Sequence, residues 1–423
     1  MSSFLTACYY FIPVFFLFAN KGFLKKTNSN NILNLSAFAC FCLFTFYSPS
    51  LITSAFTVSP DAAALGMSVL ALGFLIQDKD KKNSNIAFLF SAVFAVLAIY
   101  TKLFALVLLI ALPGYILVLR GYKKFKTYGL CLCLCLVMIT GIFALLFNIK
   151  RMFFYIFTVS ISTISNNISA GNFDLKIMIS HYLLHKHLIF IMFSIIMIFY
   201  ALFGCLLIKG RKFQKLKLWV EQNSWYLFFI MSFLMIPASI FGRMRFGGDV
   251  NTLSPFMYFL VIAICLALAK FPEQKKSAHS GFYSKSIKFL MVLIIFGFTF
   301  MQVPKLYYYA YKIRYLPKNA QKQAFNYSKK YPGRIYFPEL ALVSILSEGQ
   351  YYHCGIALKD MNDAGFLLNN KDFKKYIPNG MKMIAFSPGY NSQYVMKYFP
   401  EYAEKIEIKE LPRWEVYRKG YKN

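Results

Sequence analysis

Apolar residues occur in long blocks from Met1 to about Val303, and short polar stretches separate these blocks. Each block approaches the roughly 20 residues that an α-helix needs to cross the hydrocarbon core of a bilayer. The pattern therefore predicts a mostly α-helical, polytopic transmembrane bundle of about ten spans. The predicted spans are Phe4–Phe18, Ile32–Tyr47, Asp61–Ile76, Ile86–Tyr100, Leu103–Leu119, Tyr128–Phe147, Leu188–Ile208, Tyr226–Phe241, Leu253–Ala269 and Phe289–Val303.

The pattern changes after Pro304, where short runs typical of β-strands alternate with short helical stretches. The predicted strands are Arg334–Phe337, Met383–Phe386, Lys405–Lys409 and Trp414–Arg418. We therefore expect a transmembrane bundle over residues 1–304 and a small α/β domain over residues 305–423.

The basic residues decide the orientation of the predicted bundle. The chain is 58% hydrophobic and has a formal net charge of +30. If the loop Asn20–Asn31 is cytoplasmic, the loops on that side hold 20 Lys and Arg residues, and the opposite loops hold seven. Cytoplasmic loops carry the excess of Lys and Arg, so the tail after Val303 is predicted to be extracytoplasmic, and ten spans place Met1 on the same side. Basic residues spread between spans do not form the single basic face of a nucleic-acid-binding protein, so no nucleic-acid partner is expected.

One acid stands out at the predicted outer surface. Asp61 is the only acidic residue before Asp78, and it follows Thr57-Val-Ser-Pro60 at the start of an apolar span. An unpaired acid buried there would cost several kcal/mol. Asp61 also complements the positive end of the helix dipole. The residue is therefore a candidate for function.

Two further groups of polar residues are predicted on the same side of the membrane. Lys102 lies in the short link between two spans, where it is either a snorkelling anchor or a contact for phosphate. The loop Gly242-Arg-Met-Arg-Phe-Gly-Gly-Asp-Val-Asn251 holds Arg243 and Arg245 beside a flexible glycine pair. Arginine forks match phosphate oxygens, and glycine lets backbone N–H groups approach an anion. A solvated loop with snorkelling arginines is the alternative.

Three stretches together resemble a known family of membrane enzymes. They are Ser59-Pro-Asp61 followed by Ala-Ala-Ala-Leu-Gly-Met-Ser-Val-Leu-Ala-Leu, then Ala98-Ile-Tyr-Thr-Lys102, and then Gly247-Gly-Asp-Val-Asn-Thr-Leu-Ser-Pro255. The chain resembles the GT-C type membrane glycosyltransferases, in the branch of protein mannosyltransferases, aminoarabinose transferases and RgtA/B/C/D-like transferases. These enzymes take sugars from polyprenyl-phosphate donors.

The resemblance implies an activity, partners and roles for particular residues. It implies transfer of a sugar from a polyprenyl-phosphate donor to an extracytoplasmic lipid or glycan acceptor, in the bacterial inner membrane. Asp61 would be the catalytic acidic residue and the ligand of a divalent metal ion, where one is used. Lys102, Arg243 and Arg245 would bind the donor phosphate. The loop residues Gly247, Gly248, Asp249 and Asn251 would contact the substrate.

The chain departs from the family in one respect. The family carries its principal catalytic carboxylate in a first outer loop, and this sequence resembles the family from its second span onward. We therefore expect a truncated transferase that lacks the first span and loop. The alternative is a non-catalytic membrane protein, such as a carrier of lipid-linked glycans or a degenerate transferase subunit.

Overall fold

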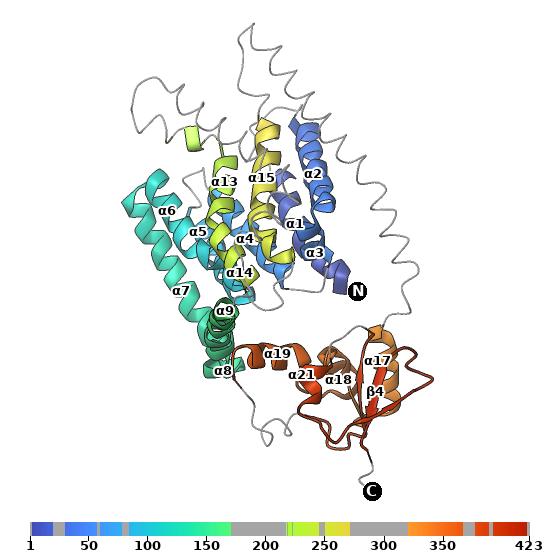
Figure 1. Ribbon diagram of the computed structural model, residues 1–423. Coiled ribbons are helices and arrows are strands. Elements are labelled where there is room, and N and C mark those ends of the chain that lie inside the picture. Colours follow the sequence, from blue (N-terminus) through green and yellow to red (C-terminus); the bar gives the residue numbers. More distant parts are fainter. Residues whose placement is uncertain are drawn as a thin grey trace. The chain divides into compact units, whose positions relative to one another are not determined.

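The protein is described by a computed structural model that is mostly helical, with one small sheet (Figure 1). The residues that it describes are 2–19, 30–56, 60–77, 84–170, 217, 219–221, 223–244, 250–270, 320–366, 377–388 and 392–420. The chain divides into two compact units. The first comprises Met1–Met152 and Phe173–Val303, and the second comprises Phe153–Asn172 and Pro304–Asn423.

The first unit is a bundle of apolar helices. Its elements are α1 (Ser2–Ala19), α2 (Asn30–Tyr47), α3 (Pro49–Phe56), α4 (Asp61–Gln77), α5 (Ser84–Thr101), the 3₁₀ helix η1 (Leu103–Val107), α6 (Leu108–Arg120), α7 (Tyr122–Leu146), α13 (Trp225–Leu234), α14 (Ile236–Met244), the 3₁₀ helix η4 (Val250–Leu253) and α15 (Ser254–Lys270). The short helix α8 (Ile149–Phe153) follows α7.

Three stretches among the described residues are long and apolar enough to cross a membrane: Leu103–Arg120, Tyr122–Leu146 and Trp225–Met244. A fourth is counted if Leu35–Phe46 and Ser50–Phe56, which meet at a bend of 99°, form one broken span. Shorter apolar helices cover Phe4–Ala19, Asp61–Ile76, Asn85–Thr101 and Asn251–Ala267. The helices therefore suit a membrane protein, while the count of ten spans stays a prediction. Two of the predicted spans, Leu188–Ile208 and Phe289–Val303, lie outside the described residues.

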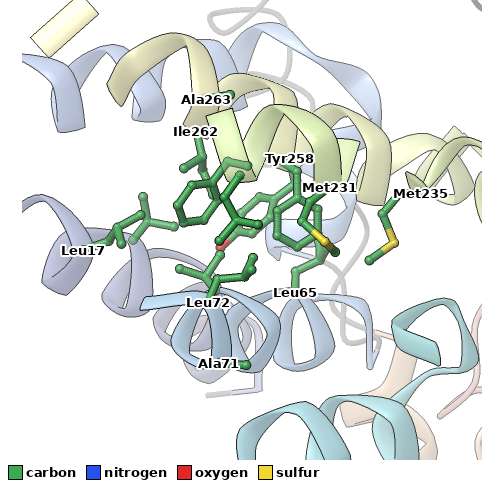
Figure 2. Close-up of a cluster of buried hydrophobic side chains, with 14 of the residues drawn as sticks. Leu17, Leu65, Ala71, Leu72, Met231, Met235, Tyr258, Ile262 and Ala263 are labelled. Carbon is green, nitrogen blue, oxygen red and sulfur yellow. The ribbon is translucent and has the colours of Figure 1, made fainter. Parts of the chain in front are cut away.

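The core of the bundle lies where α1, α4, α13 and α15 meet (Figure 2). Figure 2 shows Tyr258 and Ile262 of α15 among side chains of the other helices, including Leu72 of α4 and Met231 of α13. The phenol of Tyr258 donates a hydrogen bond to the backbone oxygen of Tyr10 over 2.9 Å. This bond gives the buried hydroxyl the partner that it needs in an apolar interior.

A second polar link joins α4, α5 and α7. The Ser91 hydroxyl donates a hydrogen bond to the Ala71 carbonyl over 2.8 Å and lies 3.3 Å from the Tyr128 hydroxyl. All three residues are fully buried. Because an unsatisfied polar group is costly away from water, these contacts favour one register between the three helices.

The second unit contains a four-stranded sheet with helices around it. The strands are β1 (Ile335–Tyr336), β2 (Met383–Phe386), β3 (Glu404–Ile406) and β4 (Glu415–Arg418), in the order β1-β2-β4-β3. β1 and β2 are parallel, and the other two pairs are antiparallel. The helices are α17 (Ala320–Lys330), α18 (Ala341–Glu348), α19 (Gly355–Asp363) and α21 (Gln393–Met396). Each strand overlaps one of the four ranges expected from the sequence.

A segment far from the sheet in sequence also belongs to this unit. The π-helical turn η2 (Phe154–Val159) and helix α9 (Ser160–Ser169) pack against α19. Val159 forms a buried cluster with Met361 and Ala364, and the Asn166 amide donates a hydrogen bond to the Asp363 backbone oxygen over 3.0 Å. The sequence pattern predicts that these residues belong with the bundle, because nothing local indicates a partner almost 200 residues away.

Candidate functional site

The candidate site is built around Asp61, the first residue of α4. Ala62 and Ala64, which follow it in the helix, are fully buried, and Asp61 itself is only 1% exposed. Its place in the first helical turn puts the negative carboxylate at the positive end of the helix dipole. Burial of a charge in such surroundings still requires partners that replace its water.

Lys102 supplies the first partner. Its backbone N–H donates the last hydrogen bond of α5, to Ala98 over 2.9 Å, and its extended conformation (φ −159°, ψ 133°) ends that helix. The ammonium group of Lys102 donates to Oδ1 of Asp61 in an ion pair. The Lys102 side chain remains 34% exposed, so one side of the pair faces the outside of the bundle.

Asn251 supplies the second partner. It lies in η4, directly before α15, and its Nδ2 donates a hydrogen bond to Oδ2 of Asp61 over 3.0 Å. Both carboxylate oxygens are therefore held by donors from two other elements. We call Asp61, Lys102 and Asn251 the Asp61 cluster.

The remaining residues expected at the site have different outcomes. Arg243 is partly exposed and lies in the last turn of α14, a helix that packs beside η4. Arg245, Gly247, Gly248 and Asp249 lie outside the described residues. The structure therefore brings three of the expected residues together and leaves the role of the glycine loop a prediction.

Buried serines beside η4 and α15 were not expected from the sequence. Ser50 and Ser54 of α3 and Ser254 at the start of α15 are fully buried. α3 packs against both η4 and α15. Among the described residues, none provides a hydrogen-bond partner for these three hydroxyls. The four-residue spacing of Ser50 and Ser54, which places both on one face of a helix, was the available signal.

The divalent metal ion expected at Asp61 stays a prediction. Within the described parts of the chain, no group of three His, Cys, Asp or Glu side chains comes together. At Asp61 the ammonium of Lys102 already bonds Oδ1, where a cation would bind, and the amide nitrogen of Asn251 bonds Oδ2. Hard divalent ions need several oxygen donors. We therefore derive no chemical step through a metal.

The Asp61 cluster presents two kinds of chemistry at one point. Each carboxylate oxygen has two lone pairs, and the bonds from Lys102 and Asn251 use one on each oxygen. Likewise, an ammonium group has three N–H donors, and one is used on Asp61. The cluster is therefore equipped to take up a proton and to bind an anion side by side.

Comparisons with models of protein families, with curated proteins and with solved structures find no match to this chain.

Proposed function

We propose that the protein is a membrane glycosyltransferase that moves a sugar from a polyprenyl-phosphate donor to an extracytoplasmic lipid or glycan acceptor. The single observation that carries the proposal is the Asp61 cluster, in which a buried carboxylate is paired with a partly exposed ammonium at the end of apolar helices. Its support from sequence is the resemblance to GT-C enzymes at Asp61, Lys102 and Asn251.

The residues of the cluster fit the charges that such a reaction moves. An acceptor hydroxyl attacks C1 of the donor sugar, and the bond between C1 and the phosphate oxygen breaks with its electron pair going to the phosphate. The acceptor proton goes to the Asp61 carboxylate, which acts as general base. Lys102 stabilises the negative charge on the departing polyprenyl phosphate. Asn251 holds the carboxylate in place through Oδ2.

Two variants, one that removes the Asp61 charge and one that removes both charges of the ion pair, test the proposal. Asp61→Asn alone leaves the Lys102 charge without its partner, so we compare it with Asp61→Asn/Lys102→Gln, which removes both charges. Loss of the general base is expected to lower transfer by about 10²–10⁴-fold in both forms. The measurement is transfer of label from a panel of polyprenyl-phosphate sugars to extracted envelope lipids and glycans by protein in vesicles.

Binding is measured separately with unglycosylated polyprenyl phosphate. A lost charge-assisted contact is worth about 1.5–3 kcal/mol, so binding to the double variant should weaken roughly tenfold or more. Lys124→Gln, a change on α7, is the matched control and should bind as the parent does. Transfer by the folded double variant at the parent rate would reject the proposal. Binding without transfer in the parent would favour the alternative, a carrier or a degenerate subunit.

A further inference from the structure

The segment from Ile149 to Ser169, formed by α8, η2 and α9, has two faces of different character. On one face Val159, Thr163 and Asn167, which are spaced four residues apart, are buried. Val159 packs there against Met361 and Ala364 of the second unit, which we call the C-terminal unit. The phenyl rings of Phe154 and Phe366 add an edge-on contact with centroids 5.1 Å apart. This face therefore packs against other residues of its own unit.

The other face is apolar and exposed. Phe153, Phe157 and Ile161 are again spaced four residues apart, and they are 45%, 38% and 64% exposed. The rings of Phe153 and Phe157 stack with centroids 5.6 Å apart, so they form one continuous surface. The π-helical turn η2 includes Phe157, and its hydrogen bonds join residues five positions apart instead of four, which helps residues four apart to stay on one side. We call these three side chains the apolar stripe.

The charges at the start of the segment indicate what covers the apolar stripe. Lys150 and Arg151 lie in α8, and no acidic residue occurs between Asn148 and Ala170. The Asn148 side chain accepts a hydrogen bond from the Arg151 backbone N–H over 3.1 Å, which caps the new helix. Basic residues beside an aromatic, apolar face are typical of a helix that lies on an anionic lipid surface.

The position of the segment in the chain supports the same partner. α8 begins at Ile149, shortly after α7 ends at Leu146, and α7 is one of the helices long and apolar enough to span a membrane. A chain that leaves a span at this point begins its next helix at the membrane boundary. A lipid surface is therefore within reach of the apolar stripe as soon as the segment folds.

We propose that α8, η2 and α9 lie in the lipid headgroup layer, with the apolar stripe inserted and the opposite face bound to the C-terminal unit. The partner is an anionic lipid surface. The segment thereby links the α/β domain to the bilayer independently of what the Asp61 cluster does. An α/β domain held in this way has its α19 edge turned toward lipid.

Tryptophan scanning in the full-length protein tests this proposal. Phe157→Trp and Ile161→Trp place a reporter in the apolar stripe, and Leu342→Trp places one on α18, at a position that is also exposed (54%). The proteins are reconstituted in vesicles of phosphatidylcholine and phosphatidylglycerol with brominated acyl chains. The contribution of the three native tryptophans is subtracted with the parent protein.

The added tryptophans in the stripe should be quenched at least about twofold more strongly than the one at position 342, because an interfacial helix buries its apolar face ~5–10 Å deep. Unchanged thermal unfolding shows that each variant is folded. Equal quenching at all three positions would overturn the proposal. Short-wavelength emission at position 157 without bromine quenching would also overturn it, since a second protein surface would then cover the stripe.

Discussion

Gly66 shows how a single residue lets two helices of the bundle approach each other. Pro13 has no backbone N–H, so within α1 the Tyr9 carbonyl lacks the donor that an α-helix would normally supply four residues later. α4 passes at this point, and a Cβ atom on Gly66 would lie 2.0 Å from the Tyr9 oxygen. Only a residue without a side chain fits there.

We expect Gly66→Ala to destabilise the bundle by about 1–3 kcal/mol or more, because a methyl group must displace backbone and not a movable side chain. Thermal unfolding in detergent, followed by size-exclusion chromatography, measures the effect. Gly73→Ala is a control on the same helix, where the nearest atom to the added Cβ is Leu17 Cδ1 at 3.7 Å. Equal melting temperatures for the two variants would contradict the close contact.

At the scale of elements, the break between α2 and α3 was only half predictable. Tyr47-Ser-Pro-Ser correctly indicates the end of a helix, since proline disfavours helical conformation in the residue before it. The new helix that begins at Pro49 was not predicted, although proline is well suited to the first helical position. The direction of α3 depends on its packing against η4 and α15, which no local pattern encodes.

The members of the Asp61 cluster were easier to predict from the sequence than the break between α2 and α3. Alternation of the spans placed Asp61, Lys102 and Asn251 at one predicted surface, and the structure brings these three together. The burial of Asp61 and the use of both its oxygens depend on side-chain geometry and were not predictable. The partnership of α9 with α19 was equally hidden, because it joins residues 197 positions apart.

The loop before α19 carries a titratable group whose burial has a measurable effect. The backbone oxygen of His353 accepts a hydrogen bond from the Tyr336 hydroxyl of β1, and burial lowers the pKa of His353 from its ordinary value of 6.5. The folded unit therefore favours the neutral imidazole. The stabilisation this gives is fully present above pH 6.5 and is lost as the pH falls toward the lowered pKa, since the unfolded chain binds a proton first.

Accordingly, hydrogen-exchange protection of β1 and α19, corrected for intrinsic exchange, should fall as the pH is lowered from about 7.5 to about 5.5. Titration of one group can lower the free energy of opening by at most ~1.4 kcal/mol per pH unit. His353→Gln should remove most of this dependence. His279→Gln, outside the C-terminal unit, should leave it in place. A pH dependence that is unchanged in His353→Gln would assign it to other groups.

At the scale of the whole molecule, the distribution of charge makes a prediction about orientation. Loops on one predicted side hold 20 basic residues, and loops on the other side hold seven. We expect a reporter that is active only outside the cytoplasm to be active when fused after Asn423. The same reporter fused after Lys82 should be inactive. An inactive but well-expressed fusion at Asn423 would reverse the orientation and remove the Asp61 cluster from the outer surface.

The hydrogen bond from Asn251 to Asp61 joins residues 190 positions apart, whereas Lys102 is 41 positions from Asp61. These separations impose an order on assembly during synthesis. At ~5–20 residues per second, the ribosome adds Asn251 roughly 10–40 s after Asp61. Throughout most of that interval the chain contains Lys102 but not yet Asn251. Among the described helices of the bundle, α15, which also carries the Tyr258 bond to α1, is made last. The ion pair between Lys102 and Asp61 can therefore form early in synthesis, whereas the contacts of α15 form late. A nascent chain stalled before η4 would contain Asp61 and Lys102 but would lack the hydrogen bond from Asn251.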